Sequence, residues 1–310
     1  MILTVTPNTA LDRVLFLPRL RIGGRNQATA SLEAMGGKGC CVSLVLARLG
    51  TATLATGLAG GDAGRRMEAL LRAAGADTDF VWTAGETRVN LVLLEDNGRH
   101  TTVCAEGLLP TPADAGRLIE RLRGHAAEAE AIVVAGSPPA GWSLAEYEAV
   151  VRAARGAGKP LVVDAAGAAL HAALCVRPEA IKPNRDELAQ AVGRPIRRAQ
   201  EAAQEAAALV EKGAGMVLAS LGRGGAVLVT RAGAWRAPAL SVAARNPAGA
   251  GDAMAAALAL GLARGWRPAR ILREAIALAA AAVEHPATGD LDPAAVPGHR
   301  ERVRVRRVHL

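Results

Sequence analysis

A single carboxylate, Asp252, lies at the start of a long apolar segment, directly after Gly249-Ala250-Gly251. It is the only charged residue between Arg245 and Arg264. One interpretation is an N-cap, because aspartate oxygens accept hydrogen bonds from the free N–H groups of a helix's first turn. The other is chemical, since small residues expose a helix N-terminus to an anion and a carboxylate beside it can act on that anion. This stretch alone favours the cap.

Two other segments place polar groups after predicted strands. Asn184 and Glu187 follow the strand predicted at 180–182 and have the spacing of a capping box. An amide and a carboxylate at a strand's carboxyl end could also hold water around Mg²⁺, which prefers oxygen ligands. The segment 220–225, SLGRGG, follows another predicted strand. It is either a hairpin turn or a glycine-rich backbone that can approach a nucleotide phosphate closely.

The first half of the chain supplies further polar side chains. Asp12 precedes a β-rich run, and Lys38 lies in the glycine turn 36–39 before a predicted helix. Arg88 and Asn90 share one face of a strand, because side chains alternate along it. Ser137 follows a buried strand. Each of these residues, taken alone, is more typical of a structural role.

Two common nucleotide-binding motifs are absent from the sequence. Lys38 follows glycines, but it precedes Gly39 and does not form the G-x-x-x-x-G-K-[ST] pattern. No G-x-G-x-x-G opens an early strand–helix unit. These absences exclude Walker-type and dinucleotide-binding motifs, and they argue against a third alternative, a dinucleotide-dependent oxidoreductase.

The elements that must position these residues alternate along the chain. Helices are predicted at 40–49, 62–74, 112–125, 144–155, 199–212, 253–263 and 268–285, and strands at 2–6, 14–17, 53–58, 131–135, 160–163, 180–182, 216–220 and 226–230. Such alternation predicts a mostly parallel sheet covered on both faces, with functional groups at the strands' carboxyl ends. The β-rich runs 87–95 and 99–104 flank Asp96-Asn97-Gly98, which indicates a hairpin.

Composition excludes several classes of function. The 310 residues are 51% hydrophobic but only 2% aromatic, and the net charge is +8. Because the arginines are scattered among acids and stacking aromatics are scarce, we expect no nucleic-acid partner. The alternation of Val and Arg near 303–308 predicts an edge strand. Four cysteines without a C-x-x-C pair argue against zinc and disulfides. Without a signal peptide or a long uncharged apolar run, we expect a cytoplasmic protein with no membrane partner.

Together and in this order, the motifs resemble the PfkB (ribokinase-like) carbohydrate kinases, in particular the 1-phosphofructokinase and tagatose-6-phosphate kinase branch. They are TVTPNTALD at 4–12, GGKG at 36–39, TRVN at 87–90, AGSPP at 135–139, KPNRDEL at 182–188, SLGRGG at 220–225 and NPAGAGD at 246–252. The resemblance implies a ribokinase-like three-layer α/β/α sandwich with a mostly parallel central sheet and a small β-sheet lid. We expect one domain, 1–310, with the lid formed near 10–35 and 86–106.

The resemblance also implies ATP, Mg²⁺ and a phosphorylated ketohexose as substrate, fructose 1-phosphate or tagatose 6-phosphate. Asp252 would accept the hydroxyl proton, beside an anion hole made by Gly249, Ala250 and Gly251. Asn184 and Glu187 would organise Mg²⁺ through water. The residues expected to face ATP are Lys182, Ser220, Gly222 and Gly225. Asp12 would bind sugar hydroxyls. The substrate's phosphate would be held by Lys38, Arg88, Asn90 and Ser137. The remaining substrate-binding residues would be Gly37 and Cys41.

The sequence departs from the family pattern at three places, one of which is Ala165-Ala166 after Asp164, where the branch often has Ser or Thr. Cys41 stands where the branch usually has Asn, and Gly224 stands where it usually has Glu. Because of Cys41, a non-catalytic regulator that binds sugar phosphates is one alternative function. A PfkB-type kinase of an unphosphorylated sugar or nucleoside is the other alternative, against which Lys38 and Arg88 argue because a neutral substrate needs no such cations. Exposed strand edges in the lid also suggest a homodimer.

Overall fold

Segments rich in Val, Leu, Ile and Ala form the central strands of the computed structural model, which describes residues 1–310. Strands β1 (Ile2–Thr6), β9 (Ala131–Ala135) and β10 (Leu161–Asp164) are buried at every residue, as expected for a parallel sheet covered on both faces. The remaining strands of this sheet are β4 (Thr53–Ala59), β5 (Asp77–Thr78), β6 (Val81–Trp82), β11 (Ala180–Ile181), β12 (Met216–Ser220), β13 (Ala226–Thr230), β14 (Gly233–Ala237) and β15 (Arg306–Val308).

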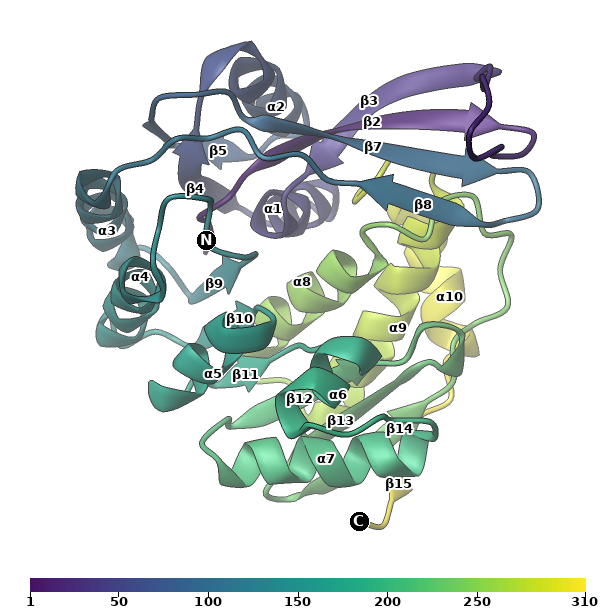
Figure 1. Cartoon of the computed structure of the whole chain (residues 1–310). Helices are drawn as coiled ribbons and strands as arrows, with labels where there is room; N and C mark the ends of the chain where they lie inside the picture. The colour runs from purple at the N-terminus through teal and green to yellow at the C-terminus, as the bar shows by residue number, and fades with distance from the viewer.

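The strand order of the main sheet is β15-β14-β13-β12-β11-β10-β9-β1-β4-β5, with β6 also pairing with β4 (Figure 1). The pairs from β12 to β5 are parallel, whereas β13, β14 and β15 add an antiparallel edge. The predicted closing edge strand is therefore confirmed as β15, although only the last three residues of the predicted 303–308 belong to it.

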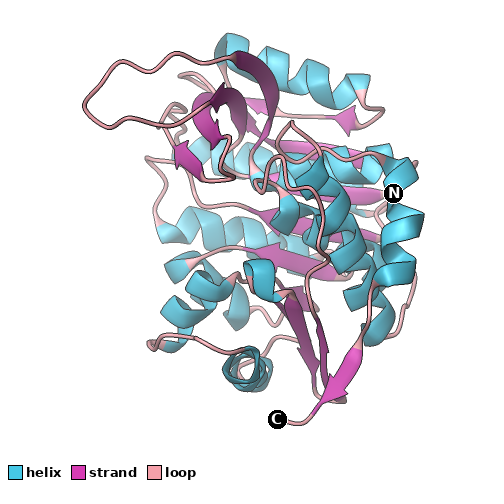
Figure 2. Ribbon diagram, turned by 90° about the vertical axis from the view of Figure 1, so that its right-hand side faces the viewer, coloured by secondary structure: helices cyan, strands magenta, loops and turns pink.

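Helices cover both faces of this sheet (Figure 2). One face packs against α3 (Pro112–Ala126), α4 (Leu144–Gly156), α5 (Gly167–Cys175), α6 (Arg185–Val192) and α7 (Ala199–Glu211). The other packs against α1 (Lys38–Arg48), α8 (Ala250–Ala263), α9 (Pro268–Glu284) and α10 (Val296–Arg302). Two short 3₁₀ turns, η1 (Gly222–Gly224) and η2 (Pro293–Ala295), complete the elements. The three-layer α/β/α arrangement is confirmed.

Helix α8 is the apolar segment that follows Asp252, and it is buried from Ala253 to Gly261. Small side chains let its neighbours approach closely, because a Cβ at Gly261 would overlap the Ile271 side chain of α9. Helix α8 also contacts α1, whose first residue is Lys38. The polar start of α8 is therefore held in a fixed position by its packed length.

A smaller four-stranded sheet lies against one end of the main body (Figure 1). Its order is β3 (Ala30–Gly36), β2 (Ala10–Leu17), β7 (Arg88–Glu95) and β8 (His100–Val103). The predicted hairpin around Asp96-Asn97-Gly98 is confirmed, since β7 and β8 pair antiparallel across it. Helix α2 (Gly61–Ala73) packs against β2 and β3. None of the helices is both long and apolar enough to cross a membrane.

Candidate active site

The start of α8 is a half-buried helix N-terminus at the edge of the main sheet. Gly249 is the N-cap in a left-handed conformation, with φ of 87°, and a Cβ there would overlap Gly289. The backbone N–H groups of Ala250 and Gly251 have no hydrogen-bond partner in the chain, whereas Asp252 N–H donates to the Gly249 carbonyl at 3.0 Å. Two free N–H groups and the positive end of the helix dipole form a binding site for an anion.

Asp252 is the third residue of α8, and its side chain makes no capping hydrogen bond. The N-cap interpretation of this residue is therefore wrong, because the left-handed Gly249 begins the helix earlier than an aspartate cap would. Burial and the charge of Asp164 raise the pKa of Asp252 to about 7, against the opposing effect of Lys38 and Lys182. A carboxylate with a pKa near neutral suits a general base.

Two lysines share one buried carboxylate beside Asp252. Asp164, the last residue of β10, is fully buried, and its two oxygens lie 2.8 Å from Lys38 Nζ and 3.0 Å from Lys182 Nζ. Lys38 Nζ also lies 3.1 Å from Glu187 Oε1. Burial opposes ionisation of Asp164, but Lys182 and Lys38 outweigh it and lower its pKa. Burial likewise disfavours the charge on Lys38, but Asp164 and Glu187 outweigh it and raise the pKa, so both groups stay charged.

Asn184 and Glu187 form the capping box that one interpretation of the sequence predicted. Asn184 Oδ1 accepts hydrogen bonds from the N–H groups of Asp186 and Glu187, both at 2.9 Å, and Glu187 Oε2 accepts from Asn184 N–H at 2.8 Å. The cap also aims Glu187 at the lysines, because its second oxygen faces Lys38. No group of three or more His, Cys, Asp or Glu side chains could ligate a metal directly.

The loop Ser220–Gly225 lies beside the start of α6. Ser220 N–H donates to the Pro183 carbonyl at 3.0 Å, and the Arg185 guanidinium donates to the Leu221 carbonyl at 3.1 Å. The hairpin interpretation is correct, since β12 and β13 pair antiparallel across this loop. Gly225 is left-handed, with φ of 84°, and a Cβ there would overlap the Ala237 carbonyl oxygen.

A second polar group lies where the smaller sheet meets the main body. Asp12 is 5% exposed and accepts a hydrogen bond from Asn90 Nδ2 at 2.9 Å. The Thr288 hydroxyl, in the loop after α9, lies near Asp12 and accepts a hydrogen bond from Asn246 Nδ2 at 3.2 Å. Burial raises the pKa of Asp12 to about 6, opposed by Asn90, Thr288 and the charge of Arg88. Arg88 makes no ion pair, and its buried Nε has no hydrogen-bond partner, so its guanidinium is free to bind an anion.

Cys41 connects the two polar groups. It is 1% exposed, and burial with the charges of Asp252 and Asp12 raises the pKa of its thiol. A Cβ built at Gly289 would lie 2.6 Å from Cys41 Sγ, so the thiol is packed beneath the loop that supports Gly249. Cys41 therefore lies under the site, and its direct contact with a substrate stays a prediction.

The structure brings most of the predicted residues together and adds two, while the place of Ser137, whose neighbour Gly136 donates its N–H to the Asp164 carbonyl at 2.9 Å, stays a prediction. Asp164 and Thr288 were not assigned a role from the sequence. An aspartate ending a buried strand was a signal for Asp164, whereas nothing in the sequence marked Thr288. Ser137 is exposed after β9 and makes no hydrogen bond to the other site residues. Gly37 is the N-cap of α1, with φ of 76°.

Comparison with known proteins reveals similar proteins over most of the chain. The model of the family described as pfkB family carbohydrate kinase matches residues 11–295. The 1-phosphofructokinase of Escherichia coli is 32% identical over 289 residues, covering 93% of both chains. That of Haloferax volcanii is 36% identical over 255 residues, covering 82% of this chain and 81% of the relative. The solved structure of E. coli phosphofructokinase-2 in complex with substrates and products superposes with a TM-score of 0.88 at 27% identity, covering 97% of this chain and 98% of that one.

Proposed function

Because the chain belongs to the pfkB family of carbohydrate kinases, we propose that it transfers the γ-phosphoryl group of ATP to a hydroxyl of fructose 1-phosphate. The family resemblance of the motifs is confirmed, and the chain is a phosphosugar kinase with an alcohol group as acceptor. Fructose 1-phosphate is favoured over tagatose 6-phosphate because relatives at 32% and 36% identity are named 1-phosphofructokinase. The product would be a ketohexose bisphosphate.

The observation that carries this proposal is the start of α8, where Asp252 adjoins the free N–H groups of Ala250 and Gly251. Phosphoryl transfer depends on alignment and charge stabilisation more than on covalent chemistry. The two N–H groups and the helix dipole stabilise charge on the transferring phosphoryl oxygens. Asp252, with its pKa of about 7, accepts the proton of the sugar hydroxyl as the new bond to phosphorus forms.

Lys38 and Lys182 supply positive charge next to Asp252. Both are fixed by Asp164, so their ammonium groups are positioned before ATP binds. Lys38 was expected to hold the phosphate already on the sugar. Its contacts with Asp164 and Glu187 favour a role at the transferring phosphoryl group instead, while Lys182 is still proposed to face the ATP phosphates.

The residues present fit Mg²⁺ only as an ion held mainly by ATP phosphates and water. Asn184 Oδ1 is committed to the cap, and both Glu187 oxygens have partners, so Glu187 would hold coordinated water with Asn184 fixing its orientation. Bound there, Mg²⁺ would neutralise charge on the phosphates. The loop Ser220–Gly225, including Gly222, would pass beside the nucleotide.

Arg88, Asn90 and Asp12 are proposed to bind the sugar phosphate. Arg88 and Asn90 share one face of β7, and Asp12 lies opposite Asn90 on β2. The unpaired guanidinium of Arg88 suits a phosphate, while Asp12 can accept hydrogen bonds from sugar hydroxyls. Roles for Gly37, Cys41 and Ser137 in substrate binding stay predictions.

A homodimer through the smaller sheet is also part of the proposal. Leu91 and Val103 are cross-strand partners on its outer face, and they are 39% and 51% exposed. Exposed apolar side chains on a sheet are typical of an interface. Sedimentation of the purified protein and of a Leu91→Glu variant tests the proposed homodimer. We expect the unmodified protein to be a dimer and the variant to be a monomer. A monomeric unmodified protein would contradict the proposed homodimer.

An ADP-release assay over fructose 1-phosphate, fructose 6-phosphate, tagatose 6-phosphate, fructose and ribose tests the function. We expect the highest kcat/KM with fructose 1-phosphate, and no turnover with an Asp252→Asn variant. The best activity on a free sugar would instead support the kinase of unphosphorylated sugars. Binding of sugar phosphates without turnover by the unmodified protein would support a regulator.

A further inference from the structure

One face of the smaller sheet carries Asp12 on β2 and Asn90 on β7, which are cross-strand partners. The apolar residues packed together on the same face are Val14, Ala34, Val92 and Leu94. Ala287, in the loop between α9 and η2, packs against this apolar cluster. The loop therefore brings its next residue, Thr288, to the two polar side chains.

The polar atoms that the smaller sheet offers at this point are mainly acceptors. Asp12 Oδ1 accepts a hydrogen bond from Asn90 Nδ2 at 2.9 Å, and Asn90 Oδ1 is buried without a partner. A buried acceptor without a partner is destabilising until a donor reaches it. A sugar hydroxyl supplies such a donor, but its own oxygen also needs a donor from the protein. The free donor on this sheet is the Arg88 guanidinium, which is proposed to bind phosphate instead.

Thr288 supplies a hydroxyl from the main body. It is 5% exposed, and its Oγ1 accepts a hydrogen bond from Asn246 Nδ2 at 3.2 Å. Asn246 is fully buried, and its amide also donates to the Pro286 carbonyl at 3.1 Å and accepts from Ala248 N–H at 3.0 Å. Because the Thr288 hydroxyl accepts from Asn246, its own proton is available to another acceptor. Asp12 lies near this hydroxyl, so the donor is offered beside the carboxylate.

The loop that carries Thr288 is held on two further sides. Gly289 packs closely on Gly249, where a Cβ would overlap it. Asp290 forms a bidentate ion pair with Arg48 of α1, with both N–O distances at 2.8 Å. The Thr288 hydroxyl is therefore fixed in place before a ligand binds, which lowers the entropy cost of binding.

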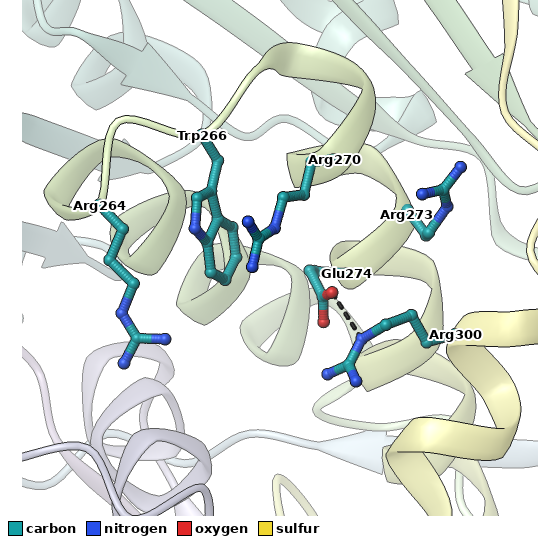
Figure 3. A pocket seen from close by; sticks show the side chains of 6 residues that line it. All are labelled: Arg264, Trp266, Arg270, Arg273, Glu274 and Arg300. Atoms are coloured by element: carbon teal, nitrogen blue, oxygen red, sulfur yellow. Dashed lines mark hydrogen bonds and ion pairs between the residues drawn. The ribbon is translucent and has the colours of Figure 1, made fainter.

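Burial and convergence distinguish this group from the arginine-lined hollow at the other end of α8 (Figure 3). The arginines there are exposed, and the Trp266 ring separates Arg264 from Arg270. Side chains that do not converge on one point give that hollow no comparable binding site. Asp12, Asn90 and Thr288, in contrast, are all buried and lie together.

We propose that Thr288 is a further substrate-binding residue, which shares one hydroxyl of the sugar with Asp12. The sugar hydroxyl would donate its proton to the Asp12 carboxylate and accept the proton of the Thr288 hydroxyl. Such a pair of acceptor and donor selects a hydroxyl at one position of the ring, because its absence leaves both protein groups unpaired. The inference rests on the proposed phosphosugar kinase function and adds a specificity-determining contact to it.

Steady-state assays of Thr288→Val and Thr288→Ser test the proposal. Valine has the shape of threonine without the hydroxyl, so the KM for fructose 1-phosphate should rise about threefold to tenfold, with little change in kcat or in the KM for ATP. Serine keeps the hydroxyl and should restore the KM to within about twofold of the unmodified protein. Thr56→Val is the matched control, because it removes a buried hydroxyl that donates to the Asp79 carbonyl at 2.6 Å, and it should leave both KM values unchanged.

Analogues of fructose 1-phosphate that each lack one ring hydroxyl, on C2, C3 or C4, identify the hydroxyl that is bound. With one analogue, Thr288→Val and the unmodified protein should have equal kcat/KM, because the partner of Thr288 is already missing. With the other two analogues, the variant should stay about threefold to tenfold weaker, since independent changes are additive.

Three outcomes would overturn the proposal. They are an unchanged KM in Thr288→Val, an equal effect of Thr288→Val on all three analogues, and a Thr288→Ser variant as weak as Thr288→Val. Each would show that the hydroxyl makes no contact with the sugar. Circular dichroism of each variant shows whether it is folded.

A failure of the proposed function is seen separately, in the unmodified protein. If the unmodified protein prefers another sugar, the proposed substrate is wrong, and the same comparison with that sugar and its deoxy analogues tests Thr288. If it binds sugar phosphates without turnover, dissociation constants from calorimetry replace KM in the comparison.

Discussion

Lys38 Nζ and Asp164 Oδ1 lie 2.8 Å apart, although the two residues are 126 positions apart in the chain. The second Asp164 oxygen lies 3.0 Å from Lys182, so one buried carboxylate fixes two cations beside Asp252. Asp164 is therefore a positioning residue, which acts on the reaction through the two lysines.

Replacing Asp164 by Asn should lower both stability and activity. The change leaves Lys182 buried without a counter-charge, and loss of one partner from a buried pair costs about 3 kcal/mol. We expect the free energy of urea unfolding to fall by about this amount and kcat to fall with it. Asp186→Asn, the same change at an exposed residue of α6, is the control. Equal stability of the two variants would contradict the role of Asp164.

Asp252→Asn should remove the general base while leaving ATP binding largely intact. The amide cannot accept the hydroxyl proton, so kcat should fall by about two orders of magnitude or more. Steady-state assays give kcat, and calorimetry gives the dissociation constant for ATP. Asp62→Asn changes an exposed acid in the first turn of α2 and should leave kcat unchanged. Near-normal turnover by Asp252→Asn would exclude this residue as the base.

The titration of Asp252 predicts opposite pH trends for activity and stability. Activity requires the ionised carboxylate, so kcat/KM should rise with pH through about 7. Because the pKa is raised in the folded state, the neutral form is favoured there, and its stabilising contribution is lost as pH rises through about 7. Asp252→Asn should therefore melt roughly 1–3 °C higher than the unmodified protein at pH 8, with a smaller difference near pH 5.

Asp12 is the control for this pH dependence, since its pKa of about 6 lies in a neighbouring range. The Asp12→Asn variant should keep the rise in kcat/KM near pH 7, at a higher KM for the sugar. If the rise in kcat/KM near pH 7 disappeared in Asp12→Asn, it would reflect the titration of Asp12 and not that of Asp252.

Arg88→Ala should weaken the phosphorylated sugar far more than ATP. Loss of a charge-assisted contact with phosphate corresponds to an increase in KM of about 10- to 100-fold. The KM for ATP should change by less than about twofold, because Arg88 adjoins Asp12 rather than the start of α8. Arg99→Ala, in the turn between β7 and β8 and with a side chain 71% exposed, is the matched control. Equal increases in both KM values would argue against a phosphate clamp.

Cys41→Asn should change the preference between fructose 1-phosphate and tagatose 6-phosphate. An amide at position 41 has two N–H donors for Asp12 and Asp252, whereas the thiol has one weak donor, which faces the Met35 carbonyl at 3.6 Å. A roughly fivefold change in the ratio of the two kcat/KM values is expected for a contact of this strength. Cys40→Ser, at a buried neighbour, controls for packing. An unchanged ratio would mean that position 41 does not influence substrate choice.

Local patterns were sufficient to predict most of the elements. The strands 2–6, 131–135, 216–220 and 226–230 were predicted with the bounds that the structure shows, because each is an apolar run between turn residues. Helix α5 was missed because its residues are almost all apolar and show no 3.6-residue period. Strand β14 was missed because its pairing with β13, rather than its own composition, defines it.

The site was predictable where a motif carries its own geometry. The glycines before Asp252 indicated a bare helix N-terminus, but the left-handed Gly249 that begins the helix depends on its contact with Gly289, 40 positions later. The role of Asp164 depends on which strand lies beside β10 and where α1 begins. Such long-range neighbours are set by topology, which the spacing of a single sequence does not specify.

The contact between Asp12 and Thr288 has a thermodynamic consequence. Asp12 belongs to the smaller sheet, whereas Thr288 belongs to the main body, so this contact lies at a seam between two separately paired sheets. A ligand that contacts both sheets is coupled to their association. It stabilises the docked arrangement of the two sheets by the same free energy that docking contributes to the binding of the ligand. Amide protons of β7 would then exchange more slowly when the sugar is bound. Hydrogen exchange in this strand would therefore measure binding of the sugar independently of turnover.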